Sequence, residues 1–228
     1  MRSALACWLA IVAVLLAGCG GKNGPSDNGI RTMTPQQILV QMKQAVAGAS
    51  SVHIVGGGTS DGSTLTLDLQ LVAGTGGAGH ISVGGLSFDV VKIGPKLYFK
   101  GEQAFLKRYA GTAASLFAGR WFEVSTAVPQ FASFASLTNI VKLTNNIVAS
   151  AGTLTKGSTT TIDGQPALAI VDSGNGGGTL YVATTGPAYP LELDPARGKG
   201  GIKFTDWDQP VTLKAPANPL DFAKLTGR

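Results

Sequence analysis

The chain has 228 residues, of which 44% are hydrophobic and only 14% are charged, and its formal net charge is +5. Glycine supplies 32 of the 228 residues, about twice its usual share of roughly 7%. The apolar content excludes a disordered chain, and the lack of a Gly-X-Y period excludes a collagen-like rod. The length is about one and a half typical domains, so we expect one large, β-rich globular domain.

The N-terminal segment predicts secretion and lipid anchoring. Arg2 precedes an uncharged apolar stretch at residues 4–17, which is shorter than the roughly 20 residues that a membrane-spanning helix needs. We therefore expect residues 1–18 to be a cleaved signal peptide, with a short retained anchor as the alternative. Residues 16–19 (LAGC) resemble the bacterial lipobox. This resemblance implies that Cys19 is lipidated and becomes the new N-terminus.

The cysteine content agrees with this processing. Of the two cysteines, Cys7 lies in the expected signal peptide, so Cys19 is the one thiol left after cleavage. A disulfide or a cysteine metal site in the mature domain is therefore excluded. The small polar residues that follow predict a flexible tether. The expected organisation is a signal peptide at 1–18, a lipidated N-terminus and tether at 19–33, and a single domain at 34–228.

The domain is expected to begin with a helix and continue as strands. Thr34 and Gln37 have the spacing of a capping box around Pro35, and the apolar residues that follow predict a helix at residues 35–48. From residue 51 the apolar period is two. The strands are expected at 51–55, 64–71, 79–83, 86–90, 96–100, 120–125, 159–162, 167–171, 179–183, 190–193 and 201–207. The connections are too short for parallel crossovers, which favours an antiparallel meander.

Two apolar helical segments are expected to interrupt the strands. The first has an apolar face made of Phe105, Leu106, Tyr109, Ala113, Leu116 and Phe117. The second covers residues 133–150 and has its apolar face at Phe131, Phe134, Leu137, Ile140, Val141, Ile147 and Val148. Its one charged residue is Lys142. Such a helix either packs into an ordinary core or lines a ligand cavity, and the sequence leaves both possibilities open.

Residues suited to catalysis or metal binding are scarce. The two histidines, His53 and His80, lie in expected strands, and the motifs of serine hydrolases and zinc proteases are missing from the sequence. Residues 74–79 match Gly-x-Gly-x-x-Gly, but a strand follows them, which favours a hairpin loop over a nucleotide site. Asp206 and Asp208 are only a weak candidate carboxylate pair. We therefore expect no enzyme activity, no metal and no cofactor.

The charge distribution argues against nucleic acid as a partner. The 18 basic residues become 17 when Arg2 is removed, against 13 acidic residues, and they form no dense cluster. This mild positive surplus suits an anionic membrane surface or lipid headgroups, and an ordinary soluble surface fits equally well.

The order of lipobox, tether, helix and long meander resembles the actinobacterial LppX/LprA/LprF/LprG lipoproteins. Short phrases of the sequence carry the same resemblance: ASSVH (49–53), VKIGPKLYFK (91–100), GRWFEV (119–124), IDGQPA (162–167) and YPLEL (189–193). The resemblance covers roughly residues 35–215. It implies an α+β fold, in which a strongly curved antiparallel sheet forms a LolA-like half-barrel with apolar helices on its concave face. Glycine-rich strand connections at 56–58 and 174–178 depart from the pattern.

The resemblance also implies a function and a site. The family holds acylated lipids or glycolipids in a hydrophobic cavity and moves them outward through the envelope from the outer face of the cytoplasmic membrane, with a possible transporter as partner. The candidate cavity residues are Leu65, Leu67, Leu69, Leu71, Phe88, Phe105, Tyr109, Leu116, Phe117, Phe131, Phe134, Leu137, Val141 and Val148. The alternative is an anchored structural or sensory lipoprotein that binds a protein and has no lipid cavity.

Overall fold

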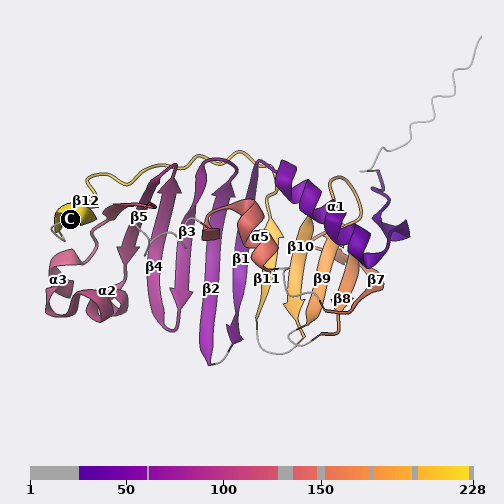
Figure 1. Cartoon of the computed structure of the whole chain (residues 1–228), viewed down its shortest axis with the longest axis horizontal. Helices are drawn as coiled ribbons and strands as arrows, with labels where there is room; N and C mark the ends of the chain where they lie inside the picture. The colour runs from indigo at the N-terminus through magenta and orange to yellow at the C-terminus, as the bar shows by residue number, and fades with distance from the viewer. Residues whose placement is uncertain are drawn as a thin grey trace, which may run out of the picture.

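One open sheet of twelve strands forms the body of the molecule (Figure 1). The computed structural model describes residues 26–60, 62–127, 136–147, 152–174, 177–196 and 200–225. The strands are β1 (Ser51–Ser60), β2 (Ser63–Val72), β3 (Gly76–Val83), β4 (Leu86–Ile93), β5 (Lys96–Gly101), β6 (Phe122–Ser125), β7 (Leu154–Ile162), β8 (Gln165–Asp172), β9 (Gly178–Ala183), β10 (Pro190–Pro195), β11 (Gly200–Thr205) and β12 (Leu220–Asp221). All eleven strands expected from the sequence are present, and β12 is the addition.

The strand order is β12-β6-β5-β4-β3-β2-β1-β11-β10-β9-β8-β7. It consists of two antiparallel meanders, β1–β6 and β7–β11, which meet where β1 pairs with β11. The expected antiparallel sheet is confirmed, apart from β12, which lies parallel to β6. One expectation needs correction: residues 56–58 are not a connection. They lie inside β1 and are paired with β2 on one side and β11 on the other.

The helices that cover the sheet lie on one of its faces (Figure 1). The helical segments are η1 (Ile30–Thr32), α1 (Pro35–Gly48), α2 (Gln103–Ala110), η2 (Gly111–Ala113), α3 (Ala114–Phe117), α5 (Ile140–Ile147) and α6 (Phe222–Leu225). The capping box of α1 is formed as expected, since Thr34 Oγ1 accepts from the Gln37 amide at 3.3 Å and Gln37 Oε1 accepts from the Thr34 amide at 2.8 Å. Within the described ranges, no helix is long and apolar enough to cross a lipid bilayer.

The two expected apolar helices are each interrupted within their sequence patterns. The first is divided into α2, η2 and α3 at Gly111, whose φ of 55° takes it out of the helical conformation. In the second segment, α5 begins at Ile140, and the side-chain oxygen of the preceding residue, Asn139, accepts a hydrogen bond from the backbone amide of Lys142 at 2.9 Å. This is an N-cap contact, and asparagine favours that position over a helix interior. Of the other residues expected in this helix, 136–138 precede Asn139, and 133–135 and 148–150 lie outside the described part of the chain.

The core lies between the helices and the face of the sheet that they cover, here called the helical face. Side chains of α1 and α5, among them Val46, Ile140 and Leu143, pack into one cluster with Ile54 and Leu69 of the central strands. A second cluster joins the first half of α1 to β8 and β9. The helices therefore bury the sheet over its middle and over the β8–β9 end.

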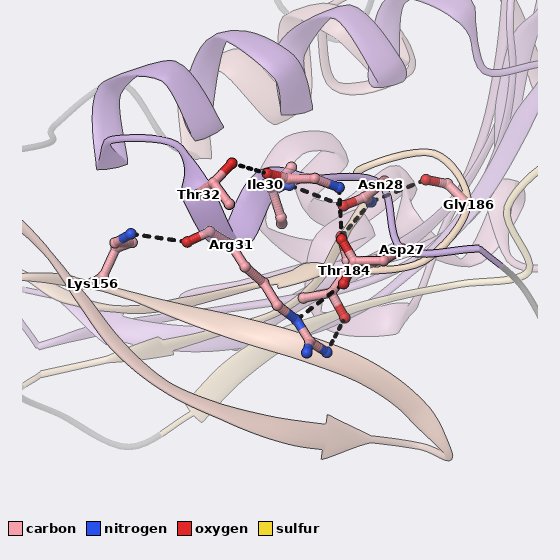
Figure 2. A network of polar contacts seen from close by, with 10 residues as sticks. Asp27, Asn28, Ile30, Arg31, Thr32, Lys156, Thr184 and Gly186 are labelled. Atoms are coloured by element: carbon pink, nitrogen blue, oxygen red, sulfur yellow. Dashed lines mark hydrogen bonds and ion pairs between the residues drawn. The ribbon is translucent and has the colours of Figure 1, made fainter.

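A polar network fixes the segment before α1 to the folded domain (Figure 2). We call residues 27–32 the N-terminal clasp. Asn28 donates Nδ2 to the carbonyl oxygens of Ala183 at 2.9 Å and Gly186 at 3.0 Å. Its backbone amide donates to the Thr184 carbonyl at 2.9 Å. The clasp is thus bound to the turn that joins β9 to β10.

The clasp also contributes to the hydrophobic core. Ile30 is fully buried and packs in the cluster that contains Met42, Leu168 and Ile170. The sequence predicts a tether up to residue 33, whereas the structure places residues 27–33 against the domain. A single isoleucine in a polar stretch has no periodicity to reveal its burial. The clasp is therefore part of the folded domain.

A long C-terminal segment crosses the same end of the sheet. The C-terminal strap, residues 206–219, runs from β11 past the ends of β1–β5 to β12 (Figure 1). Its first residues are held in place by Asp208, which accepts hydrogen bonds from the Tyr189 hydroxyl at 2.6 Å and from the Ser50 amide at 2.7 Å and hydroxyl at 3.1 Å. The Trp207 ring stacks on Tyr189 with centroids 4.2 Å apart. Asp208 therefore binds the strap to the start of β1.

The hydrogen bonds to Asp208 predict a pH dependence of stability. Burial alone would raise the pKa of this carboxyl, but hydrogen bonds from Tyr189 and Ser50 together lower it below its ordinary value. Because the pKa of Asp208 is lower in the folded state, its ionisation adds to the stability of the fold at pH values above the unfolded-state pKa of about 3.9. This added stability is lost as the pH falls through the folded-state pKa. Asp208→Asn should therefore be less stable than the parent at about pH 6, with the difference shrinking below about pH 4.

Urea unfolding at both pH values measures this effect. Tyr189→Phe serves as the comparison, because Ser50 still donates to Asp208 in that variant. We expect Tyr189→Phe to lose less stability than Asp208→Asn at about pH 6, and its loss should likewise shrink at low pH. A destabilisation by Asp208→Asn that is equal at both pH values would contradict the assigned pKa shift.

Candidate functional site

The apolar stripe of β2 passes from the covered core to an uncovered part of the sheet. Leu65, Leu67, Leu69 and Leu71 all point to the helical face because alternate residues of a strand share a face. Leu69 and Leu71 are fully buried and Leu67 is nearly so, whereas Leu65 is 38% exposed. The stripe therefore continues beyond the helices, and Leu65, at its uncovered end, lies in an open hollow.

The floor of this hollow is glycine backbone. Gly57 of β1 pairs with Gly201 of β11, and Gly58 pairs with Gly200. Gly200 has a φ of +123°, and a Cβ at this position would lie 2.2 Å from the Gly57 carbonyl oxygen. A larger residue there would displace the neighbouring strand. The paired glycines thus leave a patch of sheet without side chains beside Leu65.

Apolar side chains from four strands surround the glycine floor. The hollow, here called the glycine-floored groove, has a volume of about 400 Å³ and is lined by Gly57, Gly58, Thr59, Ser63, Leu65, Leu67, Val83, Leu193, Pro195, Gly201 and Ile202. This volume lies within the roughly 300–1,000 Å³ typical of ligand pockets. Among the described residues, its lining contains hydroxyl groups and no charged side chain. Such a groove can take an apolar chain without desolvating a charge.

The arrangement of strands and helices is shared with known lipoprotein structures. No protein-family model matches the chain, and no curated protein matches its sequence. The structure is similar to LprF from Mycobacterium bovis, with a TM-score of 0.55 and 16% identity over 81% of this chain and 97% of LprF. It is also similar to the lipoprotein LppX from Mycobacterium tuberculosis, with a TM-score of 0.50 and 18% identity over 79% of this chain and 98% of LppX. The chain has the LppX/LprF fold.

The expected fold class is thereby confirmed as a curved α+β half-barrel of the LppX/LprF type. At 16–18% identity, the likeness concerns the fold.

The described residues among the predicted cavity candidates lie in several different parts of this LppX/LprF fold. Leu65 and Leu67 line the glycine-floored groove, whereas Leu69, Leu71 and Phe88 are buried in the core. Phe105, Phe117 and Leu137 are partly buried against core clusters. Leu116 is 74% exposed, and Val141 is 37% exposed beside another hollow. Tyr109 is described only as part of α2, and Cys19, Phe131, Phe134 and Val148 lie outside the described residues.

Two further hollows have a different chemical character. One of about 250 Å³ lies where the end of α1 meets the start of α5, and Lys92 is in its lining. Another of about 620 Å³ lies beside α2 and α3, with Lys100 and Lys107 in its lining. Each contains at least one cationic side chain, so the glycine-floored groove is the better match for a purely apolar ligand.

The histidines lie on the opposite face of the sheet and are paired there. His53 Nε2 lies 2.8 Å from an Asp68 oxygen, and His80 Nδ1 lies 3.0 Å from an Asp89 oxygen. Burial alone would raise the pKa of Asp89, but contacts with His80 and Lys100 lower it. In the described ranges, His, Cys, Asp and Glu side chains form no group of three that suits a metal ion. These pairs act as ordinary cross-strand contacts.

Most residues of the groove were missed by the sequence predictions. Val83, Leu193, Pro195 and Ile202 belong to strands that were expected, but their common location depends on the pairing of β1 with β11. The signal available in the sequence was the pair of glycine runs at 56–58 and 200–201. Their correspondence becomes visible only when the strand register is known.

Proposed function

We propose that this chain is an envelope lipoprotein, anchored through Cys19 on the outer face of the cytoplasmic membrane, that binds an acyl chain of a lipid or glycolipid and carries it outward. The observation that carries the proposal is the glycine-floored groove, whose described lining residues carry no charge and which continues the apolar stripe that ends at Leu65. The similarity in fold to LppX, a lipoprotein by name, supports the same proposal.

The energetics of such binding require no catalytic group. Burying one CH₂ group from water is worth about 0.8 kcal/mol. An acyl chain that leaves a bilayer for an apolar groove exchanges one apolar environment for another, so the net transfer free energy per CH₂ is close to zero. Loading and release are then reversible without a nucleotide or a metal.

A second candidate function is an anchored structural or sensory lipoprotein. The observation in its favour is the filled core between α1, α5 and the sheet, where Leu69 and Leu71 are fully buried. Native mass spectrometry of the chain from residue 24 onward, purified from a membrane-containing host, distinguishes the two functions. The carrier retains a lipid, whereas the structural protein has the mass of the polypeptide alone.

Filling the groove should reduce lipid binding without unfolding the domain. Leu65→Trp places a larger ring beside Gly58, its partner on β1, where space is available above the backbone. Since Leu65 is 38% exposed, we expect a change in unfolding free energy within about 0.5 kcal/mol. The amount of co-purifying lipid should fall several-fold. Both quantities are measured on the same preparation.

Leu116→Trp is the matched control, because Leu116 is 74% exposed on α3 and is not part of the groove. This variant should keep the lipid content of the parent. If Leu65→Trp retained as much lipid as Leu116→Trp, the groove would not be the binding site.

Cys19 is expected to provide the membrane attachment. Cys19→Ala removes the thiol on which two acyl chains would be placed, and two chains are what stable anchoring needs. The variant should therefore appear in the soluble fraction or accumulate as an uncleaved precursor. Fractionation followed by immunoblotting measures both outcomes. Mature-sized protein that remains on the membrane would contradict this assignment.

A further inference from the structure

The end of the molecule that carries α2 and α3 is basic. We call residues 103–120, which comprise α2, η2, α3 and the turn that follows them, the α2–α3 tip. Figure 1 shows α2 and α3 at the same end of the molecule as β12, away from α1 and α5. The tip contains the basic residues Lys107, Arg108 and Arg120 and no acidic residue. Even when Glu102, which directly precedes the tip, is counted, the local net charge is +2.

The basic side chains of the tip have no anionic partner. Lys107, Arg108 and Arg120 are exposed, and none of them forms an ion pair with a described residue. The neighbouring lysine of β5 differs, since Lys100 Nζ lies 2.8 Å from a carboxylate oxygen of Asp89. Three cations at the tip are therefore available to an anionic partner.

An exposed leucine projects from the same segment. Leu116 on α3 is the most exposed large apolar side chain in the described ranges. Ala114 and Phe117, on either side of it in the helix, pack inward in a cluster with Leu106 of α2. Because successive helical residues point in different directions, Leu116 is turned away from this cluster and into solvent.

A hollow between the helices connects the leucine with the cations. Lys107 lines this hollow of about 620 Å³ together with Ser115 and Gly119. These two residues are the sequence neighbours of Leu116 and Arg120, so the apolar side chain and the cations lie around one hollow. The Lys107 ammonium and the Ser115 hydroxyl can both donate hydrogen bonds to phosphate oxygens.

We infer that the α2–α3 tip docks on the surface of a lipid bilayer that contains anionic headgroups. Lys107, Arg108 and Arg120 contact the phosphates, and Leu116 enters the boundary between the headgroups and the acyl chains. Basic residues combined with an exposed apolar side chain are typical of segments that lie at a membrane interface. The inference goes beyond the proposed function, because the tip and the glycine-floored groove share no residue.

A bilayer fits this surface better than an acidic protein does. A stable protein interface buries about 800 Å² on each partner and has an apolar centre. Among the large apolar side chains of the described residues, Leu116 is the one that is exposed on the tip. A bilayer requires no such centre, since it offers mobile phosphates above a continuous apolar layer.

The tip begins at the end of the sheet where the groove opens. The Glu102 amide donates to the Ser87 carbonyl oxygen at 3.0 Å, and Ser87 lies next to the turn that joins β3 to β4. Val83, the last residue of β3, lines the groove and is paired with Leu65. A bilayer in contact with the tip would therefore lie near the same strand ends as the groove.

Vesicle binding tests this docking surface. The chain from residue 24 onward contains every described residue and no cysteine, so no lipid anchor contributes to binding. Co-sedimentation should show that it binds mixed phosphatidylcholine and phosphatidylglycerol vesicles at low salt and is released at high salt. Binding to phosphatidylcholine alone should be weaker by at least about tenfold.

Removing the three cations of the tip should abolish most of this binding. Each Lys or Arg near an anionic membrane contributes about fivefold to binding, so Lys107→Gln/Arg108→Gln/Arg120→Gln should weaken it on the order of a hundredfold. The three side chains are exposed, and the melting temperature should stay that of the parent.

A second triple variant is the matched control for net charge. Lys43→Gln/Lys142→Gln/Lys214→Gln removes three exposed lysines from α1, α5 and the C-terminal strap. Its net charge equals that of the tip variant. Because charges away from the contact are screened by salt, binding should change by less than about threefold.

Insertion of the leucine position is tested with a fluorescent label. Leu116→Cys, made in the cysteine-free chain and labelled with the polarity-sensitive dye NBD, should brighten on mixed vesicles. Its fluorescence should then be quenched by lipids that carry a nitroxide on the acyl chain. Val40→Cys is the control, because Val40 is exposed on α1, away from the tip (Figure 1). Its label should behave as in the free protein.

The outcomes separate the possible explanations. Equal weakening by the two triple variants, or a Leu116→Cys label that stays in water on bound protein, would overturn the docking surface. Absence of vesicle binding, with binding to polyglutamate that depends on the same three cations, would also overturn it and assign the tip to an acidic protein. Leu65→Trp, which fills the groove, should dock like the parent. Loss of co-purifying lipid in that variant tests the groove and leaves the docking surface intact.

Discussion

Replacing Ile30 by Ala is expected to lower the free energy of unfolding by about 2–5 kcal/mol, which is the usual cost of removing a buried isoleucine side chain. Ile30 is fully buried and packs with Met42 and with strands β8 and β9. For a domain of this length, such a loss corresponds to a fall in Tm of roughly 4–20 °C. Urea unfolding and a thermal melt of the chain from residue 24 onward measure it.

Val40→Ala is the matched control for this substitution. Val40 lies on the exposed side of α1 and is 55% exposed, so its replacement should change the stability by no more than about 0.5 kcal/mol. A chain that begins at residue 34 lacks Ile30 and the hydrogen bonds of Asn28 and should be less stable than Ile30→Ala. If both the shortened chain and Ile30→Ala melted with the parent, the clasp would be no part of the stable domain.

The second large effect is expected at Leu69. Leu69→Trp inserts a larger side chain at a fully buried position of β2, between Ile54 of β1 and Gly79 of β3 in the strand register. Overpacking of this kind costs about 1–3 kcal/mol and sometimes more. Leu65→Trp makes the same chemical change on the same strand and face, four residues away. We expect the two variants to have opposite consequences.

Unfolding curves and lipid content together separate these two positions. Leu69→Trp should lose stability while its folded fraction keeps lipid in the groove, whereas Leu65→Trp should keep stability and lose lipid. A stable Leu69→Trp protein that has lost its lipid would show instead that the acyl chain reaches the space beneath α5. That result would move the binding site from the groove to the core.

The local elements could be predicted because their signals are local. The capping box at Thr34 and Gln37 fixes the start of α1, and the alternation from Leu65 to Leu71 identifies β2 and its apolar face. Each signal depends on residues within a few positions of one another. The eleven expected strands were found for the same reason.

The site could not be predicted because it depends on pairing between distant segments. The β1–β11 register brings Gly57 beside Gly201, and no local pattern encodes this. The burial of Ile30 likewise depends on β8 and β9, which lie more than 130 residues away. The predicted apolar list therefore mixed core residues such as Leu71 with the groove residue Leu65 and the exposed Leu116.

The late position of β11 has a consequence for how the chain folds. β1 ends at residue 60 and its second neighbour begins at residue 200, so the central pairing of the sheet has a high contact order. Sheets of this kind fold slowly, in milliseconds to seconds. In a chain made from its N-terminus, one edge of β1 stays unpaired until about the last eighth of the sequence arrives. An unpaired edge strand is a template for misassembly, so chaperone dependence should be greatest while β11 is still missing.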